Sequence, residues 1–385
     1  MIVRILSVCT NLPTRNQPQR GLFVHRRLEM LSKQVPLRAL NPQVWFPLVK
    51  PKTIDAPLET TYPIDIRPMF YLPGVAKRLD GMWMSRCVGA WLDSLPTTTT
   101  KDAVLDAHFG YPEGVGCARA AHKRGIPYFV TIRGLEVDLF QRPDIGPQLV
   151  AAIKGACHVI AVSEFLRQSA ISAGVPSDQI SVVGNGVDSA FYSPGEYNLS
   201  RNALGIPPNL KLIVSVGNLK QVKGHDVLLR ALAEIPRECN VKLVCIGALS
   251  DAGWVKRLKQ LILDLKVHDR VEFKGSLPPE HIVSWLRASD QFVLASRREG
   301  CCNAVLEALS VGVPVVATRV GDNSQYVREG FSGALVDAEN HQLLAQAMLS
   351  TMQQTYSRER ISQSMQAYSW KNAADRVIEL IGNHA

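Results

Sequence analysis

The segment Arg298-Glu-Gly-Cys-Cys-Asn-Ala-Val-Leu-Glu-Ala-Leu-Ser-Val-Gly-Val-Pro-Val-Val-Ala-Thr318 carries the strongest fold signal in this 385-residue chain. It follows an apolar run at 291–294, turns at Gly300, continues as a predicted helix from about Asn303 to near Gly312, and ends in a β-branched run. This order is typical of a βα unit in a parallel sheet. The free N–H groups and the positive dipole end of the helix, near residues 301–304, would favour a diphosphate at the carboxyl edge of that sheet.

Two carboxylates accompany this predicted phosphate site. Glu299 lies in the loop and Glu307 lies one turn into the predicted helix. Carboxylates accept hydrogen bonds from sugar hydroxyls, so each residue could bind one side of a sugar-bearing diphosphate. The alternative is that Glu299 only complements the helix dipole and that Glu307 is an exposed helix residue.

A second segment, Val214-Ser-Val-Gly-Asn-Leu-Lys-Gln-Val-Lys-Gly-His-Asp-Val-Leu-Leu-Arg-Ala-Leu232, repeats the strand–loop–helix order. Its strand ends at Gly217, its polar loop carries Asn218, Lys220 and Lys223, and its helix begins near residue 225. Lysines at this edge would neutralise the charge of a departing diphosphate. Solvated loop lysines are the alternative, because most lysines are exposed.

Short β-branched runs alternate with amphipathic stretches along the whole chain, which predicts two doubly wound parallel sheets. The polar, proline-containing stretch 189–208 reads as the linker between domains at 1–188 and 209–368. The first helix is expected at 21–33. The expected strands are 2–8, 104–107, 128–132, 159–162 and 180–183 in the first domain, and 210–216, 241–246, 271–274, 291–294 and 313–317 in the second.

A nicotinamide enzyme would carry GxGxxG directly after the first strand, and this chain has Asn-Leu-Pro-Thr-Arg-Asn at 11–16. The net charge of +9 favours anionic partners in general, but no zinc-finger spacing or aromatic RNA-binding motif accompanies it, so we expect no nucleic-acid partner. The eight cysteines form no CxxC pair and read as reduced thiols. With no apparent signal peptide or spanning segment, we expect a cytoplasmic protein.

Together the two segments resemble the retaining GT-B glycosyltransferases of the family 4 type, in which Lys-Gly opens the donor site and Glu-x7-Glu follows. The resemblance covers nearly the whole chain and implies an α/β fold of two Rossmann-like domains facing a cleft. It also implies that a C-terminal helix, within 369–385, crosses back to the first domain. By the same resemblance, Glu299 binds the donor sugar, Glu307 the nucleotide ribose and Lys223 the phosphate. The expected donor site is completed by Gly217, Asn218, Gly300, Cys301, Cys302 and Asn303.

The N-terminal half adds Gly21, which would permit close approach by donor or acceptor. His108 and Arg133 lie in segments that resemble the cleft loops after later strands, and we expect both among the catalytic residues together with Glu299 and Lys223. For His108 a structural role is the alternative. The chain departs from the family pattern at two of these positions: many members have His at the position of Arg133 and Arg at the position of Asn218.

The chemistry that the resemblance implies needs neither a cofactor nor an essential metal, since the nucleotide sugar is a co-substrate and no Asp-x-Asp is present; Glu136-Val-Asp138 is only a weak match. Retention is expected to proceed by attack on the same face as the leaving diphosphate, whose oxygen helps to deprotonate the acceptor. No protein nucleophile is nominated, and thiol catalysis by Cys301 or Cys302 is disfavoured.

The expected partners are a UDP- or GDP-linked sugar and a saccharide or lipid-linked saccharide acceptor, as in bacterial cell-surface polysaccharide synthesis. Residues 74–95 could form an amphipathic helix that contacts the inner face of the cytoplasmic membrane, although a helix packed on its own sheet is favoured. A nucleotide-sugar epimerase on the same scaffold and a non-enzymatic two-domain sugar-binding protein remain alternatives. The sequence identifies neither the donor base, the sugar, the acceptor, the linkage nor the oligomeric state.

Overall fold

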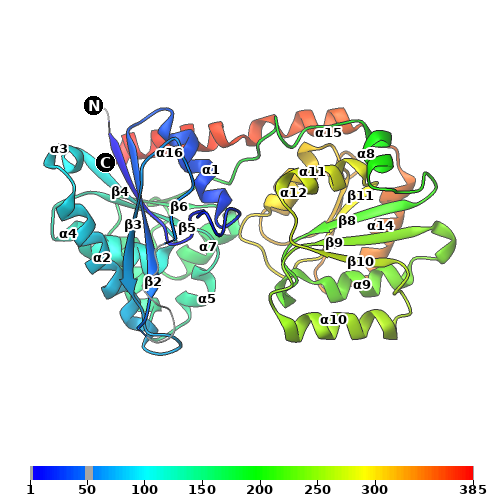
Figure 1. Ribbon diagram of the computed structural model, residues 1–385, viewed down its shortest axis with the longest axis horizontal. Coiled ribbons are helices and arrows are strands. Elements are labelled where there is room, and N and C mark those ends of the chain that lie inside the picture. Colours follow the sequence, from blue (N-terminus) through cyan, green and yellow to red (C-terminus); the bar gives the residue numbers. More distant parts are fainter. Residues whose placement is uncertain (1–2, 48–54, 385) are drawn as a thin grey trace. The chain divides into compact units, whose positions relative to one another are not determined.

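The computed structural model describes residues 3–47 and 55–384, so residues 2 and 385, at the ends of the predicted first strand and C-terminal segment, lie outside the described residues. The chain divides into two compact units. Unit 1 contains residues 1–185 and 370–385, and unit 2 contains residues 186–369 (Figure 1). Each unit is built on its own parallel sheet.

Unit 1 has a seven-stranded sheet in the order β3-β2-β1-β4-β5-β6-β7, with all neighbours parallel. The switch point of this order lies between β1 and β4, where ligands bind in open α/β sheets. The strands are β1 (Arg4–Val8), β2 (Leu37–Trp45), β3 (Ile64–Phe70), β4 (Ala103–His108), β5 (Tyr128–Ile132), β6 (His158–Ala161) and β7 (Ile180–Val182). The helices are α1 (Leu22–Ser32), α2 (Asp80–Ser94), α3 (Thr97–Thr100), α4 (Val115–His122), α5 (Glu136–Phe140), α6 (Gly146–Lys154), α7 (Glu164–Ser172) and α16 (Trp370–His384).

Unit 2 repeats the doubly wound arrangement with a six-stranded parallel sheet in the order β10-β9-β8-β11-β12-β13. The switch point lies between β8 and β11. The strands are β8 (Lys211–Val216), β9 (Val241–Ile246), β10 (Val271–Gly275), β11 (Gln291–Leu294), β12 (Val315–Thr318) and β13 (Gly333–Val336). The helices are α8 (Tyr197–Ala203), α9 (His225–Glu234), α10 (Ala252–Asp264), α11 (Pro279–Ala288), α12 (Asn303–Ser310), α13 (Asn323–Tyr326), α14 (His341–Gln353) and α15 (Arg358–Ser364).

The C-terminal helix α16 packs against α1, and both helices belong to unit 1 (Figure 1). Val377 and Leu380 of α16 share a buried cluster with Leu28 and Leu31 of α1. The sequence expectation that this helix returns to the first domain is thus confirmed.

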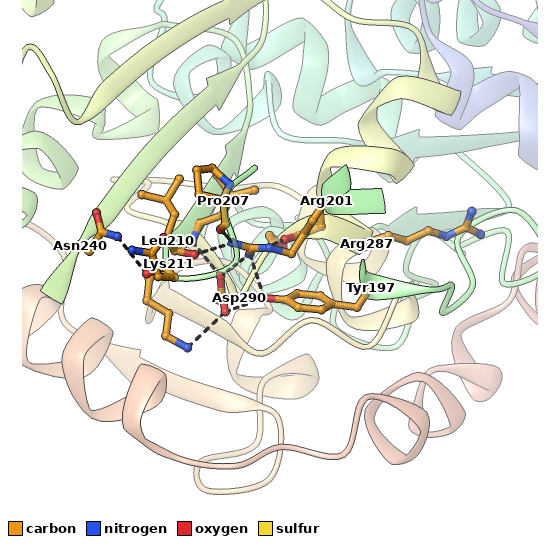
Figure 2. Close-up of polar contacts among 12 residues, drawn as sticks. Tyr197, Arg201, Pro207, Leu210, Lys211, Asn240, Arg287 and Asp290 are labelled. Atoms are coloured by element: carbon orange, nitrogen blue, oxygen red, sulfur yellow. Dashed lines mark hydrogen bonds and ion pairs between the residues drawn. The ribbon is translucent and has the colours of Figure 1, made fainter. Parts of the chain in front are cut away.

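Residues 189–208, expected as a linker, include helix α8, which lies within unit 2. Arg201 on α8 is only 3% exposed and its guanidinium donates to Asp290 Oδ2 at 3.0 Å (Figure 2). It also donates to carbonyl oxygens, among them that of Pro207 at 2.6 Å. A buried arginine needs such partners because its charge is costly to desolvate, so this network fixes α8 to the sheet.

The segment expected as an amphipathic helix at 74–95 forms α2, which packs on β3 and α4. Met84, Val88 and Trp91 are fully buried, and Trp91 Nε1 donates to Asp65 at 2.6 Å. These side chains belong to the core of unit 1, so the packed-helix interpretation is correct for this face. None of the helices in the described part of the chain has the length and apolar character needed to span a bilayer.

Candidate functional site

The predicted donor residues meet at the carboxyl edge of the unit 2 sheet, beside its switch point. The loop after β8 carries Lys223 and leads into α9, and the loop after β11 carries Glu299 and leads into α12. β8 and β11 are neighbours in the sheet, so residues 76 positions apart in sequence come together there. This is the place where an open α/β sheet binds its ligand.

Lys223 and Glu299 form the centre of this edge. Lys223 Nζ lies 2.6 Å from Glu299 Oε1, and the lysine side chain is 27% exposed while the glutamate side chain is 6% exposed. The same Oε1 accepts a hydrogen bond from Ser296 Oγ at 2.5 Å. Glu299 is therefore held in place from inside the unit, while Lys223 keeps access to solvent and to an anionic ligand.

Arg297 ties the two loops together. Its guanidinium donates to both oxygens of Asp226, at 2.9 and 2.8 Å, and also binds Glu339. Its backbone N–H donates to the Val222 carbonyl oxygen at 2.8 Å. A bidentate arginine–carboxylate pair of this kind fixes geometry as well as charge, so Arg297 holds the Lys223 loop against the Glu299 loop. Reasoning from sequence missed this residue.

Gly224 allows the two loops to approach each other. It has φ of 65°, and a Cβ atom there would lie 1.9 Å from the Ala295 carbonyl oxygen. Only glycine combines this left-handed backbone with such close contact. The Lys-Gly pair is thus explained by backbone geometry as well as by charge.

Helix α12 begins directly after this pair. Cys302 is its N-cap and Asn303 its first residue, as predicted, and the first N–H groups of a helix have no intrahelical acceptor. Cys302 is 2% exposed, and burial raises the pKa of its thiol well above the ordinary value. Cys301 Sγ lies 4.0 Å from the Tyr326 hydroxyl oxygen. Glu307 is half-buried one turn into the helix. Gly300 lies in the loop between Glu299 and α12.

The glycine and asparagine before the lysine loop serve the loop itself. A Cβ atom at Gly217 would contact the aliphatic part of Lys223, whose Cδ is 3.6 Å away. Asn218 is exposed, and its Oδ1 accepts a hydrogen bond from the Ala248 backbone N–H at 3.1 Å. The side chain of Asn218 therefore shapes the loop instead of replacing the positive charge that arginine has in related chains.

The carboxyl edge of unit 1 holds Arg133 and His108. An arginine can only donate, so His108 Nδ1 accepts from Arg133 Nη2, 3.1 Å away. The other ring nitrogen, Nε2, then carries the proton and faces Asp106 Oδ2 at 3.0 Å. Burial lowers the pKa of His108 to about 4, which keeps the ring neutral. Arg133 also donates to Asn185 Oδ1 at 3.1 Å.

His108 is completely buried, whereas Arg133 is 9% exposed. His108 can therefore influence a ligand only through Arg133, and its structural role, the alternative raised from sequence, is the one its contacts support. The guanidinium of Arg133 also lies over the Phe23 ring, 5.2 Å from its centroid. These contacts leave Arg133 in one fixed orientation at the sheet edge.

Gly21 was expected to permit close approach by a ligand, and the structure gives a different reason for it. It has φ of 61° at the N-cap of α1, and a Cβ atom there would lie 1.7 Å from the Asn11 carbonyl oxygen. The close approach is thus made by the chain's own backbone.

Glu136, part of the weak metal-like match, is fully buried and accepts backbone N–H bonds from Gly110, Arg133 and Gly134 at 2.7, 3.0 and 2.8 Å. Its lone pairs already serve the loops after β4 and β5. Within residues 3–47 and 55–384, no group of three or more histidine, cysteine, aspartate or glutamate side chains is arranged to hold a metal ion.

Comparison with known proteins identifies the family. The family model of the glycosyl transferases group 1 matches residues 197–368, and the model of Glycosyltransferase Family 4 matches residues 24–191. Among solved structures, sucrose-phosphate synthase from Thermosynechococcus elongatus has a TM-score of 0.80 at 17% identity, over 99% of this chain and 98% of that one. HepE from Anabaena in complex with UDP and glucose has a TM-score of 0.75 at 19% identity, over 99% of both chains. At these identities the structures show a shared fold.

Curated relatives include the D-inositol 3-phosphate glycosyltransferase of Corynebacterium efficiens, 33% identical over 53% of this chain and 50% of that protein. D-inositol 3-phosphate glycosyltransferase 1 of Catenulispora acidiphila is 26% identical over 79% of this chain and 78% of that protein. The chain spans about half the length of the first of these relatives. The two family models cover consecutive parts of the chain, and the chain belongs to the family 4 glycosyltransferases, the glycosyl transferases group 1, with the GT-B fold.

Proposed function

We propose that this chain is a retaining hexosyltransferase that takes a sugar from a UDP- or GDP-linked donor and transfers it to a saccharide or lipid-linked saccharide in polysaccharide synthesis. The observation that supports this most directly is the Lys223–Glu299 pair, 2.6 Å apart at the carboxyl edge of unit 2 and beside the start of α12. The UDP and glucose in the HepE structure favour a uridine donor. The eight free cysteines favour the cytoplasm, where disulfides are rare, and peripheral membrane contact is part of the proposal.

In the proposed donor complex, Lys223 and the N–H groups at the start of α12 bind the diphosphate. Glu299, held by Ser296, accepts a hydrogen bond from a hydroxyl of the donor sugar. Glu307 accepts from the ribose. The proposed contacts therefore divide between a cation for the phosphates and two carboxylates for hydroxyl groups, which suits the chemistry of each ligand part.

In the proposed reaction, the bond between the anomeric carbon and the diphosphate oxygen breaks as the acceptor oxygen bonds to that carbon on the same face. The acceptor proton moves to the departing diphosphate. Lys223 stabilises the charge that develops on the diphosphate, so no metal ion is required. Arg133 is proposed as a substrate-facing residue of unit 1, and His108 as the residue that orients it.

Titration calorimetry of the purified chain against UDP, GDP and ADP, with and without EDTA, tests the proposal. We expect one diphosphate to bind independently of EDTA, and Glu307→Ala and Lys223→Met to weaken that binding at least tenfold. Lys211→Met removes a lysine at the opposite edge of the same sheet and should change the Kd less than twofold. If the wild-type chain binds none of the three diphosphates, the proposed donor site is wrong.

A further inference from the structure

A cavity of about 410 Å³ opens at the carboxyl edge of unit 1, wholly within that unit. It lies where β1, β2 and β3 end, because Thr10 follows β1, Asn41 lies in the second half of β2, and Tyr71 directly follows β3. Its volume falls in the range of roughly 300–1,000 Å³ that is usual for small-molecule sites. Parallel α/β sheets bind their ligands at this edge.

One wall of the cavity contains a buried hydroxyl group without a partner. Thr14 is 3% exposed, and its Oγ1 has no hydrogen-bond partner in the described part of the chain. Asn41, 2% exposed, adds a carboxamide to the same cavity. Buried polar groups are usually paired, so a ligand that brings hydroxyl groups would satisfy Thr14.

The remaining lining combines apolar and acidic groups. Pro42 and Met69 supply apolar surface, and Tyr71 supplies a ring. Asp55 and Asp80 face the cavity with carboxylates, which accept hydrogen bonds from hydroxyl groups.

The charge of this lining disfavours an anionic ligand. Two carboxylates oppose the single cation Arg20 among the described lining residues. Asp80 lies 3.5 Å from Lys77, and Asp55 accepts from Asn16 at 2.9 Å, so both carboxylates are fixed and keep further lone pairs. A phosphate group would meet these carboxylates at short range, whereas an uncharged sugar ring offers hydroxyl donors to them and C–H faces to the apolar wall.

We propose that this cavity is the subsite for an uncharged saccharide, the acceptor of the transfer reaction. The proposal rests on the proposed function, and it narrows the acceptor to a sugar that carries no phosphate at the bound ring. Relatives of this chain are named for a phosphorylated acceptor, inositol 3-phosphate, so the lining of the cavity distinguishes this chain from them.

Saturation-transfer NMR on the full chain tests the subsite with four probes: methyl α-glucoside, sucrose, myo-inositol and glucose 6-phosphate. At least one uncharged probe should bind, and glucose 6-phosphate should bind at least fivefold more weakly than methyl α-glucoside. Thr14→Val keeps the shape of the side chain and removes the hydroxyl group, so it should weaken binding of the uncharged probe about tenfold. Thr97→Val, at an exposed position of the same unit, should leave that binding unchanged.

Binding of UDP to the same variants separates this proposal from the donor-site proposal. Thr14→Val should keep the wild-type affinity for UDP, which also shows that the chain is folded. If UDP fails to bind the wild-type chain while the uncharged probe binds and responds to Thr14→Val, the proposed function is wrong and the subsite stands. If no uncharged probe binds, if glucose 6-phosphate binds more tightly, or if Thr14→Val has no effect, the subsite is overturned.

Discussion

Glu113 joins the ends of β1 and β4 at the switch point of unit 1. Its carboxylate is 1% exposed and accepts from the backbone N–H and the hydroxyl group of Thr10, at 3.0 and 2.5 Å. Burial raises the pKa of Glu113 to about 7, and the nearby Glu136 adds to the increase, while the bonds from Thr10 oppose it. Thr10 also lines the proposed saccharide cavity, so the protonation state of Glu113 bears on that site.

The raised pKa predicts a pH-dependent stability. A carboxyl group that is protonated more readily in the folded chain stabilises it below the unfolded pKa of about 4.5, and this stabilisation is lost as the pH rises through about 7. Glu113→Gln does not titrate and keeps an oxygen for Thr10. We expect the variant to gain stability relative to wild type between pH 4.5 and 8, by roughly 3 kcal/mol. Urea unfolding at both pH values measures this, and an equal difference at both would contradict the assignment.

The sequence predicted the residues of the donor site that lie in local motifs and missed those that act across the chain. Lys223 and Glu299 each stand in a recognisable strand–loop–helix segment, and the structure brings their side chains together. Arg297 and Asp226 are 71 positions apart, and neither belongs to a motif. Their pairing depends on β8 and β11 being neighbours, which no local pattern encodes.

At the scale of elements, the start of α9 positions the donor loop. Gly224 is the N-cap of α9 in a left-handed conformation, directly after Lys223 and in close contact with the backbone after β11. A change there would alter both the helix start and the lysine loop.

Gly224→Ala should therefore damage both stability and donor binding. Gly205 offers a matched control, because it also has φ of 65° but a Cβ atom there would meet nothing within 4 Å. Gly205→Ala should cost only the backbone strain, about 1–2 kcal/mol, and leave the affinity for UDP unchanged. Gly224→Ala should cost clearly more and weaken UDP binding at least tenfold. Thermal unfolding and calorimetry on both variants measure these effects, and equal costs would show that the contact with Ala295 is easily relieved.

Strands with continuous apolar runs could be predicted, and strands interrupted by polar residues or proline could not. β5, β9 and β11 match the predicted ranges to the residue, because strands buried on both faces read as apolar runs. β2 and β3 were missed: each contains proline, and β3 lies at the edge of the sheet and is mostly half-buried. The four-residue β13 was also missed. Tertiary pairing, which the local sequence does not show, forms these strands.

At the scale of the whole molecule, the chain completes unit 1 only after it has built unit 2. Residues 370–385 belong to unit 1, although 184 residues of unit 2 precede them (186–369). Helix α16 supplies Val377, which is fully buried in the cluster that also contains Leu28 of α1 and Ile5 of β1. Unit 1 therefore depends on the end of the chain for part of its core.

Val377→Asp should thus destabilise unit 1 and leave the donor site of unit 2 working. The substitution buries a charge without a partner, which is expected to cost several kcal/mol. Hydrogen exchange followed by mass spectrometry should show lost protection in β1, β4 and β5, with protection retained in β8, β11 and β12 and a UDP affinity within twofold of wild type. Glu379→Ala, at an exposed position of the same helix, controls for a change in α16 itself. Equal loss of protection in both sheets would mean that the two units unfold together, because α16 would then stabilise the whole chain and not unit 1 alone.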